Sequence, residues 1–335
     1  MNNKQLFWLL LFRQLGLVKK SGFSIVEKML SLVMAGMITS ALIGMMNQFI
    51  ESDKQQAAFL ATEKDAQIAL DYITEDLREA VFVYEEISDT LIAALPDFSA
   101  IPGLGDSAQP ILAFWKTEPV TDLPNACNPA NGFFSALVQE ECRLLLTKRN
   151  AYTLVVYLQT TEPSDKWLGK SRIVRYALSK YTKPQQLTIS RGFVDPAIYN
   201  NFFIWPYDKD GVNRQAQRPD PLANTTPPQP QPMVLVDFID IPNRSEFRSD
   251  SNPNLPPEPL TCPTNYARVP EEADTHNSFF ACVRITEGRL GVNQDIIVYL
   301  RANAEGRDRL TKTVEHIPNL QAQVTLRGVI DKFGR

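Results

Sequence analysis

The chain has 335 residues and a formal net charge of −4, a length that allows one sizeable hydrophobic core or two small ones. Residues 1–22 contain four basic side chains and no acidic one, so the rest of the chain has a net charge of −8. This acidic balance without basic clusters argues against a nucleic-acid-binding protein, and no nucleic-acid partner is expected.

An apolar segment follows the basic leader. No charged side chain occurs from Met29 to Met46, and the apolar character extends to Ile50. A bilayer core requires about 20 residues of helix, so we expect a membrane-spanning helix here. A secretory signal peptide would have a shorter apolar region of about 7–15 residues. The basic leader predicts, by the positive-inside rule, that everything beyond Ile50 lies outside the cytoplasm.

The leader and the apolar segment meet in the sequence Gly-Phe-Ser-Ile-Val-Glu, from Gly22 to Glu27. A glutamate inside a membrane segment is costly and usually serves a function. Together with the basic pair Lys19 and Lys20, this junction resembles the class III signal of the type IV prepilin and pseudopilin family. The resemblance implies that a prepilin peptidase cleaves between Gly22 and Phe23 and that the new amine of Phe23 is methylated. An uncleaved signal anchor is the alternative.

The resemblance also implies a role in assembly for Glu27, which would pair with the N-terminal amine of a neighbouring subunit. The implied partners are the prepilin peptidase/methylase, other pilins or pseudopilins through the N-terminal helix, and an inner-membrane assembly platform; no cofactor is expected. The implied location is the inner (cytoplasmic) membrane, spanned once, with the head outside the cytoplasm. Lys28 departs from the family's usual apolar residue, which favours a subunit at the tip of a pilus-like fibre over one in its interior.

A one-sided apolar pattern continues after the membrane segment and predicts an amphipathic helix of period near 3.6. Its apolar members are Ala58, Ala61, Ala66, Ala69, Ile73, Leu77, Ala80 and Val81. The acidic residues between them are expected to face solvent, and they are Asp65, Asp71, Glu75, Asp76 and Glu79. We therefore expect a helix as far as Val83, with a membrane and assembly part, 23–50, and a spine, 51–83.

Residues 84–335 are expected to form a globular head. Its first part, 84–150, is interpreted as loop with short elements, and the proline-rich range 206–259 as an insertion. Alternating or β-branched runs predict strands at 152–159, 172–178, 233–239, 279–285, 295–301 and 321–329. Short connections favour antiparallel pairing. The predicted fold class is α+β, type IV pilin-like, with the long N-terminal α-helix packed on one antiparallel β-sheet.

Four cysteines occur as two pairs that are close in sequence, Cys127 with Cys142 and Cys262 with Cys282. Outside the cytoplasm, an even number of cysteines at such spacing favours two local disulfides. Four free, buried thiols are the alternative. A structural zinc site is not expected, because the sequence lacks the CxxC-type spacing of zinc ligands.

The sequence contains no recognisable catalytic constellation. Its only histidines are His276, in a polar loop, and His316, shortly before Pro318. Either could act as a general base in principle, but an isolated loop histidine is more typical of a solvated side chain. We therefore do not expect an enzyme.

A weak calcium candidate lies around a glycine turn, where Asp208, Asp210 and Asn213 supply oxygen atoms. Oxygen ligands of this kind suit Ca²⁺, but the bidentate glutamate that an EF-hand loop requires is missing. A polar β-turn is the favoured interpretation, and no metal is expected.

Three further segments resemble the J/W class of minor pseudopilins: 69–80, 297–304 and 324–329. With the proline-rich insertion, they are most similar to pseudopilins of hormogonium polysaccharide secretion. This resemblance implies a minor pseudopilin of a type IV pilus-like machine that serves polysaccharide secretion and gliding motility. The alternatives are a W-type minor pilin of a type IV pilus, a J-type pseudopilin of type II secretion, and a membrane-anchored extracytoplasmic binding module.

Overall fold

The computed structural model describes most of the chain in two compact units, Met1–Gln56 and Ala57–Arg335. The described residues are 24–101, 104–120, 127–128, 136–183, 187–198, 202–215, 231–242, 261–271, 277–286, 294–307 and 319–326. The leader and the expected cleavage site between Gly22 and Phe23 therefore lie outside the described residues, as do His276 and His316.

Helix α2, Ile25–Arg78, is the longest element, and its residues up to Gln56 belong to the first unit. All described residues in that part are exposed. Polar side chains within the apolar run bond back to the helix: the hydroxyl of Thr39 donates to the carbonyl of Ala35 at 2.8 Å. Such bonds let a hydroxyl lie in an apolar segment without an unsatisfied donor.

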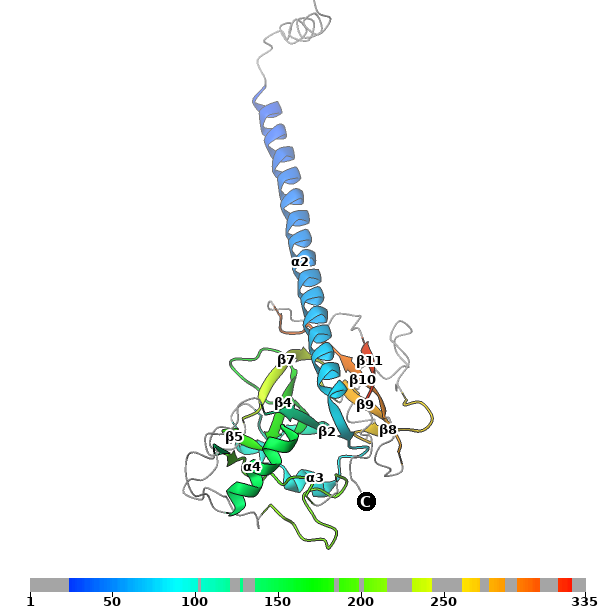
Figure 1. Cartoon of the computed structure of the whole chain (residues 1–335). Coiled ribbons are helices and arrows are strands. Elements are labelled where there is room, and N and C mark those ends of the chain that lie inside the picture. The colour runs from blue at the N-terminus through cyan, green and yellow to red at the C-terminus, as the bar shows by residue number, and fades with distance from the viewer. Residues whose placement is uncertain are drawn as a thin grey trace, which may run out of the picture. The chain divides into compact units, whose positions relative to one another are not determined.

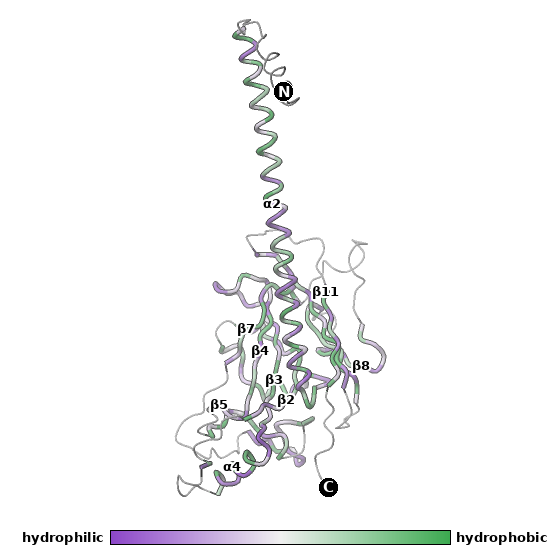
Figure 2. Tube along the Cα trace, turned by 45° about the horizontal axis from the view of Figure 1, so that its top comes forward, coloured by the Kyte–Doolittle hydropathy of each residue, from purple (hydrophilic) through white to green (hydrophobic). Residues whose placement is uncertain are grey.

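The part of α2 in the second unit buries one side. The buried residues are Ala58, Thr62, Ala66, Ala69, Leu70, Ile73, Thr74, Asp76 and Leu77. This confirms the predicted stripe for most of its members. The expectation that Asp76 faces solvent is wrong, since it is only 6% exposed. Figure 2 shows the contrast in hydropathy between the mainly apolar N-terminal half of α2 and its mixed C-terminal half.

The helix ends at Arg78, so the predicted spine, 51–83, is too long. Residues Ala80–Val83 form strand β1 instead, which pairs antiparallel with β2, Gln109–Pro119. The sequence Ala-Val-Phe-Val is rich in β-branched and aromatic residues, which favour a strand when a neighbouring strand edge is available.

The main sheet has five antiparallel strands in the order β1-β2-β3-β4-β7. Its remaining members are β3, Asn150–Thr160, β4, Ser171–Ser179, and β7, Met233–Ile239. Strand β2 was not predicted, because 84–150 was interpreted mainly as loop. The same range also contains α3, Asp89–Ala94, η1, Phe98–Ala100, and α4, Ala136–Lys148.

A second antiparallel sheet has four strands in the order β11-β10-β9-β8. These strands are β8, Tyr266–Val269, β9, Phe279–Arg284, β10, Asp295–Arg301, and β11, Asn319–Thr325. A short pair, β5, Tyr181–Lys183, and β6, Thr188–Ile189, is separate. The α+β class and the antiparallel pairing are thus confirmed, but the prediction of one sheet is wrong.

The two faces of the five-stranded sheet carry different cores. On one face, Leu70 and Ile73 of α2 share a core with Val155 of β3 and Phe279 of β9, so this core joins the helix to both sheets (Figure 1). The other face packs against α3, α4 and the aromatic side chains of Phe193, Phe202 and Trp205. Its central side chain is Trp115, whose ring centroid lies 5.5 Å from that of Trp205 in an edge-to-face arrangement.

A buried polar seam joins the two sheets beside the bridge between Ile239 and Ala302. The Arg301 Nε donates to Oδ2 of Asp240 at 2.8 Å, and the Asn303 amide donates to Oδ1 at 2.9 Å. The amide of Gln159, in β3, donates to the backbone carbonyl of Asp240 at 2.9 Å. The seam satisfies buried polar groups, as the interior of a protein requires.

Strand β7 lies inside the range 206–259, so the proline-rich range is not one continuous insertion. Its strand pairs with β4 and forms one edge of the main sheet. Trp205, the residue just before this range, is buried in the aromatic core. Val236 and Ile239 of β7 belong to the core that contains α2, so the range contributes to the core there. Residues 216–230 and 243–260 lie outside the described residues.

Candidate functional site

The first candidate site is the N-terminal half of α2. Of the described helices, α2 alone is long and apolar enough to cross a membrane, by length and composition. Its large exposed apolar residues include Ile25, Val26, Met29, Leu30, Leu32, Val33, Met34, Met37, Ile38, Leu42 and Ile43. A helix that is apolar on all sides suits lipid or a bundle of similar helices, because it has no polar face to present to water.

Glu27 lies in the first turn of this helix. Its backbone N–H donates to the carbonyl of Ser24 at 3.0 Å, so the helical turn is already formed there. An acidic side chain in the first turn interacts favourably with the helix dipole. Among the described residues, Glu27 has no ion-pair partner. The carboxylate is therefore available to a positive group that approaches the start of the helix.

A second candidate site is a buried charged cluster where α2 meets the main sheet, and sequence analysis missed it. Asp76 accepts hydrogen bonds from Lys116 Nζ at 2.9 Å, from Arg175 Nε at 2.6 Å and from the Tyr157 hydroxyl at 2.7 Å. Lys116 Nζ also donates to Glu79 at 3.0 Å. The donors come from β2, β3 and β4, so the last turn of α2 is bonded to the three central strands.

Electrostatics keep this cluster charged. Burial acts to raise the pKa of Asp76, but the hydrogen bonds and charge of its cationic neighbours, chiefly Arg175, bring the pKa below its ordinary value. Burial likewise acts to lower the pKa of Lys116, but Asp76 and Glu79 raise it. The pKa of Tyr157 is raised, first by burial and then by the adjacent Asp76. The buried Asp76 thus lies between two cations, and Lys116 also pairs with the more exposed carboxylates of Glu79 and Glu118 at the edge of the cluster.

The cluster is suited to holding the helix and not to chemistry on a substrate. Both oxygens of Asp76 are occupied by donors from the protein. A buried pair of this kind is expensive to break, because removal of one partner leaves an uncompensated charge. The spacing was the available signal, since Asp76 lies three residues after Ile73 and four residues before Ala80, both members of the predicted apolar stripe.

The four cysteines are joined as the sequence predicts, Cys127 to Cys142 and Cys262 to Cys282, with Cα–Cα distances of 5.3 Å and 5.5 Å. The first pair ties Cys127, nine residues before the start of α4, to Cys142 in the helix itself. The second ties the start of the β8 region to β9, within the four-stranded sheet. Both pairs therefore brace the head, and neither lies in a candidate binding site.

The calcium candidate forms a polar turn. The carboxylate of Asp208 accepts from the backbone N–H groups of Asp210 and Val212 at 2.9 Å each, and it pairs with Arg214. The backbone N–H of Gly211 donates to the carbonyl of Asp208 at 3.0 Å, which closes the turn. Within the described residues, no group of three or more His, Cys, Asp or Glu is arranged to hold a metal ion.

Comparison of the chain with protein-family models, with curated proteins and with solved structures finds no match. The functional argument therefore depends on the residues themselves. Of the predicted site residues, the structure describes Glu27, the cysteines and the turn at Asp208, while the processing residues Gly22 and Phe23 lie outside it.

Proposed function

We propose that the chain is a minor pseudopilin, a membrane-anchored structural subunit of a type IV pilus-like machine that serves polysaccharide secretion and gliding motility. The observation that carries the proposal is helix α2. It begins at Ile25, directly after the expected processing site, has Glu27 in its first turn and continues to Arg78. Such a helix can serve first as a membrane anchor and then as the element through which subunits pack.

Processing after Gly22 would leave Phe23 with a free amine, four residues before Glu27 in the sequence. In a bundle of parallel subunits, that amine can approach the Glu27 carboxylate of a neighbour. An unpaired charge inside an apolar bundle costs several kcal/mol, whereas a pair offsets much of that cost. The penalty on wrong stacking then selects the register of the subunits. Lys28 can extend its amine to the lipid headgroups before assembly, as long basic side chains do near helix ends.

The Asp76 cluster supports the same role from the other end of the helix. A force transmitted along α2 during assembly would reach the head through its last turns, where Asp76, Lys116 and Arg175 bond the helix to the sheet. The buried stripe of α2 adds apolar packing around this cluster. The head is thereby attached to the helix by both polar and apolar contacts.

Complementation of a deletion strain tests the proposal. The strain would receive the wild-type gene, a Glu27→Ala variant, a Glu51→Ala variant, or a secreted chain that starts at Ser52. Glu51 is the matched control, because it is an exposed acid of the same helix beyond the apolar run. We expect wild type and Glu51→Ala to restore motility and polysaccharide export. Glu27→Ala should be processed and folded but fail to assemble.

The secreted head separates this proposal from its main competitor. A membrane-anchored binding module would need the helix only as a tether, and the cavity described below favours that alternative. Restoration of function by the chain starting at Ser52 would therefore contradict the pseudopilin mechanism. A W-type minor pilin of a type IV pilus or a J-type pseudopilin of type II secretion would also require the helix and Glu27, so this complementation experiment does not separate them from the proposed protein. Neighbouring genes distinguish these, since glycosyltransferases nearby favour polysaccharide export.

A further inference from the structure

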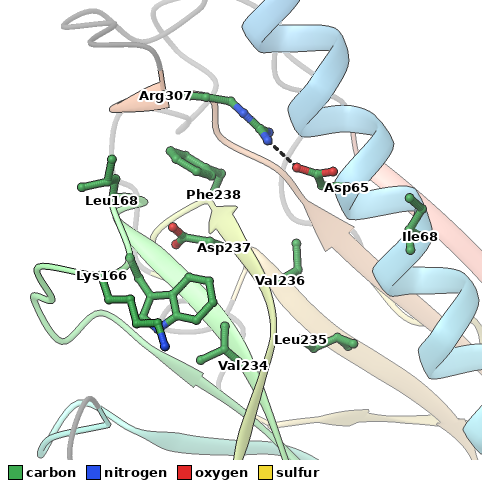
Figure 3. A pocket seen from close by; sticks show the side chains of 11 residues that line it. Asp65, Ile68, Lys166, Leu168, Val234, Leu235, Val236, Asp237, Phe238 and Arg307 are labelled. Atoms are coloured by element: carbon green, nitrogen blue, oxygen red, sulfur yellow. Dashed lines mark hydrogen bonds and ion pairs between the residues drawn. The ribbon is translucent and has the colours of Figure 1, made fainter.

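An open cavity of about 420 Å³ lies in the second unit, away from the Asp76 cluster. Its wall is formed by α2, by the connection between β3 and β4 at 166–168, by β7 from Val234 to Phe238, and by Arg307. Its volume lies within the range of about 300–1,000 Å³ that is typical of small-ligand sites. Figure 3 shows Asp237 and Phe238 between Leu168 and Lys166 on one side and Arg307 and Asp65 on the other.

The cavity combines an aromatic surface with apolar strand residues. Trp167 lines it, half-buried, and Lys166 Nζ lies 5.7 Å from the centre of the indole ring. Val234 and Val236 of β7 and Ile68 of α2 add apolar surface. A tryptophan has a large apolar face and can pack against the C–H groups of a flat ligand, while its N–H remains able to donate a hydrogen bond.

The charges of the lining balance. Arg307 pairs with Asp65 and donates to Thr62 at 2.9 Å, so these two lining charges neutralise each other. The other charged lining residues are Lys166 and Asp237. Two acids and two bases favour a ligand without net charge, because a phosphate or a carboxylate would meet as much repulsion as attraction.

Asp237 has unused hydrogen-bonding capacity. One carboxylate oxygen, Oδ2, accepts from the backbone N–H of Gly169 at 3.0 Å. The other, Oδ1, is buried and has no hydrogen-bond partner among the described residues. Gly169 permits this close approach, since a Cβ there would lie 2.4 Å from Oδ1. A buried acceptor without a donor costs about 1–3 kcal/mol. Asp237 lines the cavity, so a hydroxyl that donated to this carboxylate from the cavity would remove that cost.

We propose that this cavity binds a short, neutral oligosaccharide, which stacks a sugar ring on Trp167 and donates a hydroxyl hydrogen bond to Asp237. A sugar ring has an apolar face of C–H groups that can pack on Trp167, and hydroxyl groups at its edge that can donate to Asp237. The site itself follows from the lining residues. Its assignment to the exported polymer rests on the proposed function.

The experiment uses the full chain in lipid nanodiscs, because detergents with sugar headgroups would compete for the site. Cellohexaose and maltohexaose serve as probes, since they are neutral glucans of extended and curved shape. Binding is measured by saturation-transfer NMR with empty nanodiscs as the blank. We expect at least one probe to bind wild type, and Trp167→Ala and Asp237→Asn each to weaken it at least about tenfold.

Two further variants keep the test sharp. Trp167→Phe retains an aromatic face and should bind better than Trp167→Ala, whereas a merely structural defect would not be rescued in this order. Asp165→Asn is the matched carboxylate control, because Asp165 is exposed and outside the lining; it should bind as wild type does. Failure of both probes to bind wild type, or equal binding by wild type, Trp167→Ala and Asp237→Asn, would overturn the proposal.

The result is independent of assembly, because the binding measurement needs neither processing nor a filament. If the sugar binds but Glu27→Ala assembles normally, the pseudopilin mechanism fails and the saccharide site stands. If Glu27→Ala blocks assembly but neither sugar binds, the saccharide site fails and the pseudopilin mechanism stands.

Discussion

Leu42 and Leu70 belong to the same helix, but Leu42 is 60% exposed and Leu70 is fully buried. Around Leu42 the helix is apolar on every side and the described protein covers none of it. Around Leu70 it is apolar on one side only, and that side is packed against both sheets. The apolar surface around Leu42 must be covered by lipid or by partner helices to be removed from water. The apolar surface around Leu70 is already covered by strands of the same chain.

The two parts of α2 differ in what covers their apolar surface. Apolar surface that is covered by the chain's own strands stabilises the head, at roughly 25 cal/mol for each Å² removed from water. Apolar surface that remains exposed stabilises the protein only when something else covers it. The position of a residue along α2 therefore predicts whether a mutation affects the folding of the head or only a surface that the chain itself does not cover.

The largest expected effect is on processing. Gly22→Leu should abolish cleavage, because the peptidase of the family implied by the signal cuts after a glycine. Intact-mass measurement should find the leader still attached to the variant, and wild type should begin at methylated Phe23. A wild-type chain that still begins at Met1 in cells with an active prepilin peptidase would contradict the family assignment.

Removal of the buried acid at the other end of the helix should unfold the head more easily. Asp76→Ala should lower the free energy of unfolding by about 3–5 kcal/mol, since it leaves Lys116 and Arg175 without their shared partner. Asp71→Ala is the control: Asp71 is exposed and accepts one surface hydrogen bond from Gln67, so the change should be about 0.5 kcal/mol or less. Urea unfolding followed by tryptophan fluorescence measures both, since Trp115 and Trp205 are buried in the head.

The two leucines give a matched pair. Leu70→Ala should lower the free energy of unfolding of the head by about 2–5 kcal/mol, because it leaves a cavity in the core. Leu42→Ala removes the same atoms from an exposed position and should leave the urea midpoint unchanged. If Leu42→Ala destabilised the head as much as Leu70→Ala, the two parts of α2 would not differ as described.

The disulfides should contribute less per bond than the charged cluster. Cys127→Ser should cost about 3 kcal/mol by the chain-entropy argument for a loop of 15 residues. Peptide mapping under non-reducing conditions should recover Cys127 with Cys142 and Cys262 with Cys282. Crossed pairs, or four thiols that can be alkylated in exported protein, would contradict the predicted pairing.

Local patterns predicted the long helix α2 and the strands β3, β4, β7, β9, β10 and β11, but not the short helices or the other strands. The stripe of α2 and strands such as β7 and β10 follow from periods of 3.6 and 2 that depend only on neighbouring residues. Strand β2 escaped prediction because Ile111 to Trp115 is buried on both faces, and a continuous apolar run does not show the alternation of a half-exposed strand. The division into two sheets is also not local, since strand order depends on pairing between distant segments.

The candidate sites also differ in whether their residues are close together in the sequence. Glu27 could be proposed from the sequence because its motif is contiguous, and its role in assembly stays a prediction. The Asp76 cluster was missed because the partners that make its burial tolerable are 40 and 99 residues away. The cavity beside Trp167 was missed for the same reason, since its wall brings together α2, β7, the 166–168 connection and Arg307. A contiguous motif can be read from the chain, but a site assembled from distant elements requires the fold.

The smallest expected effect concerns pH, and it isolates the charge of Asp76 from its packing. The folded pKa of Asp76 lies below its ordinary value of 3.8, so its ionisation stabilises the head fully above that value. This stabilisation should be lost as pH falls through the folded pKa.

Asp76→Asn keeps the size of the side chain but cannot ionise. The difference in unfolding temperature between wild type and variant, called here the stability gap, should therefore narrow from pH 7 to pH 3. Thermal unfolding of both proteins across this range measures the gap, and other carboxylates cancel because both proteins contain them. A gap that stayed constant or widened would mean that Lys116 and Arg175 do not hold Asp76 ionised, and that packing alone fixes the last turn of α2 to the sheet.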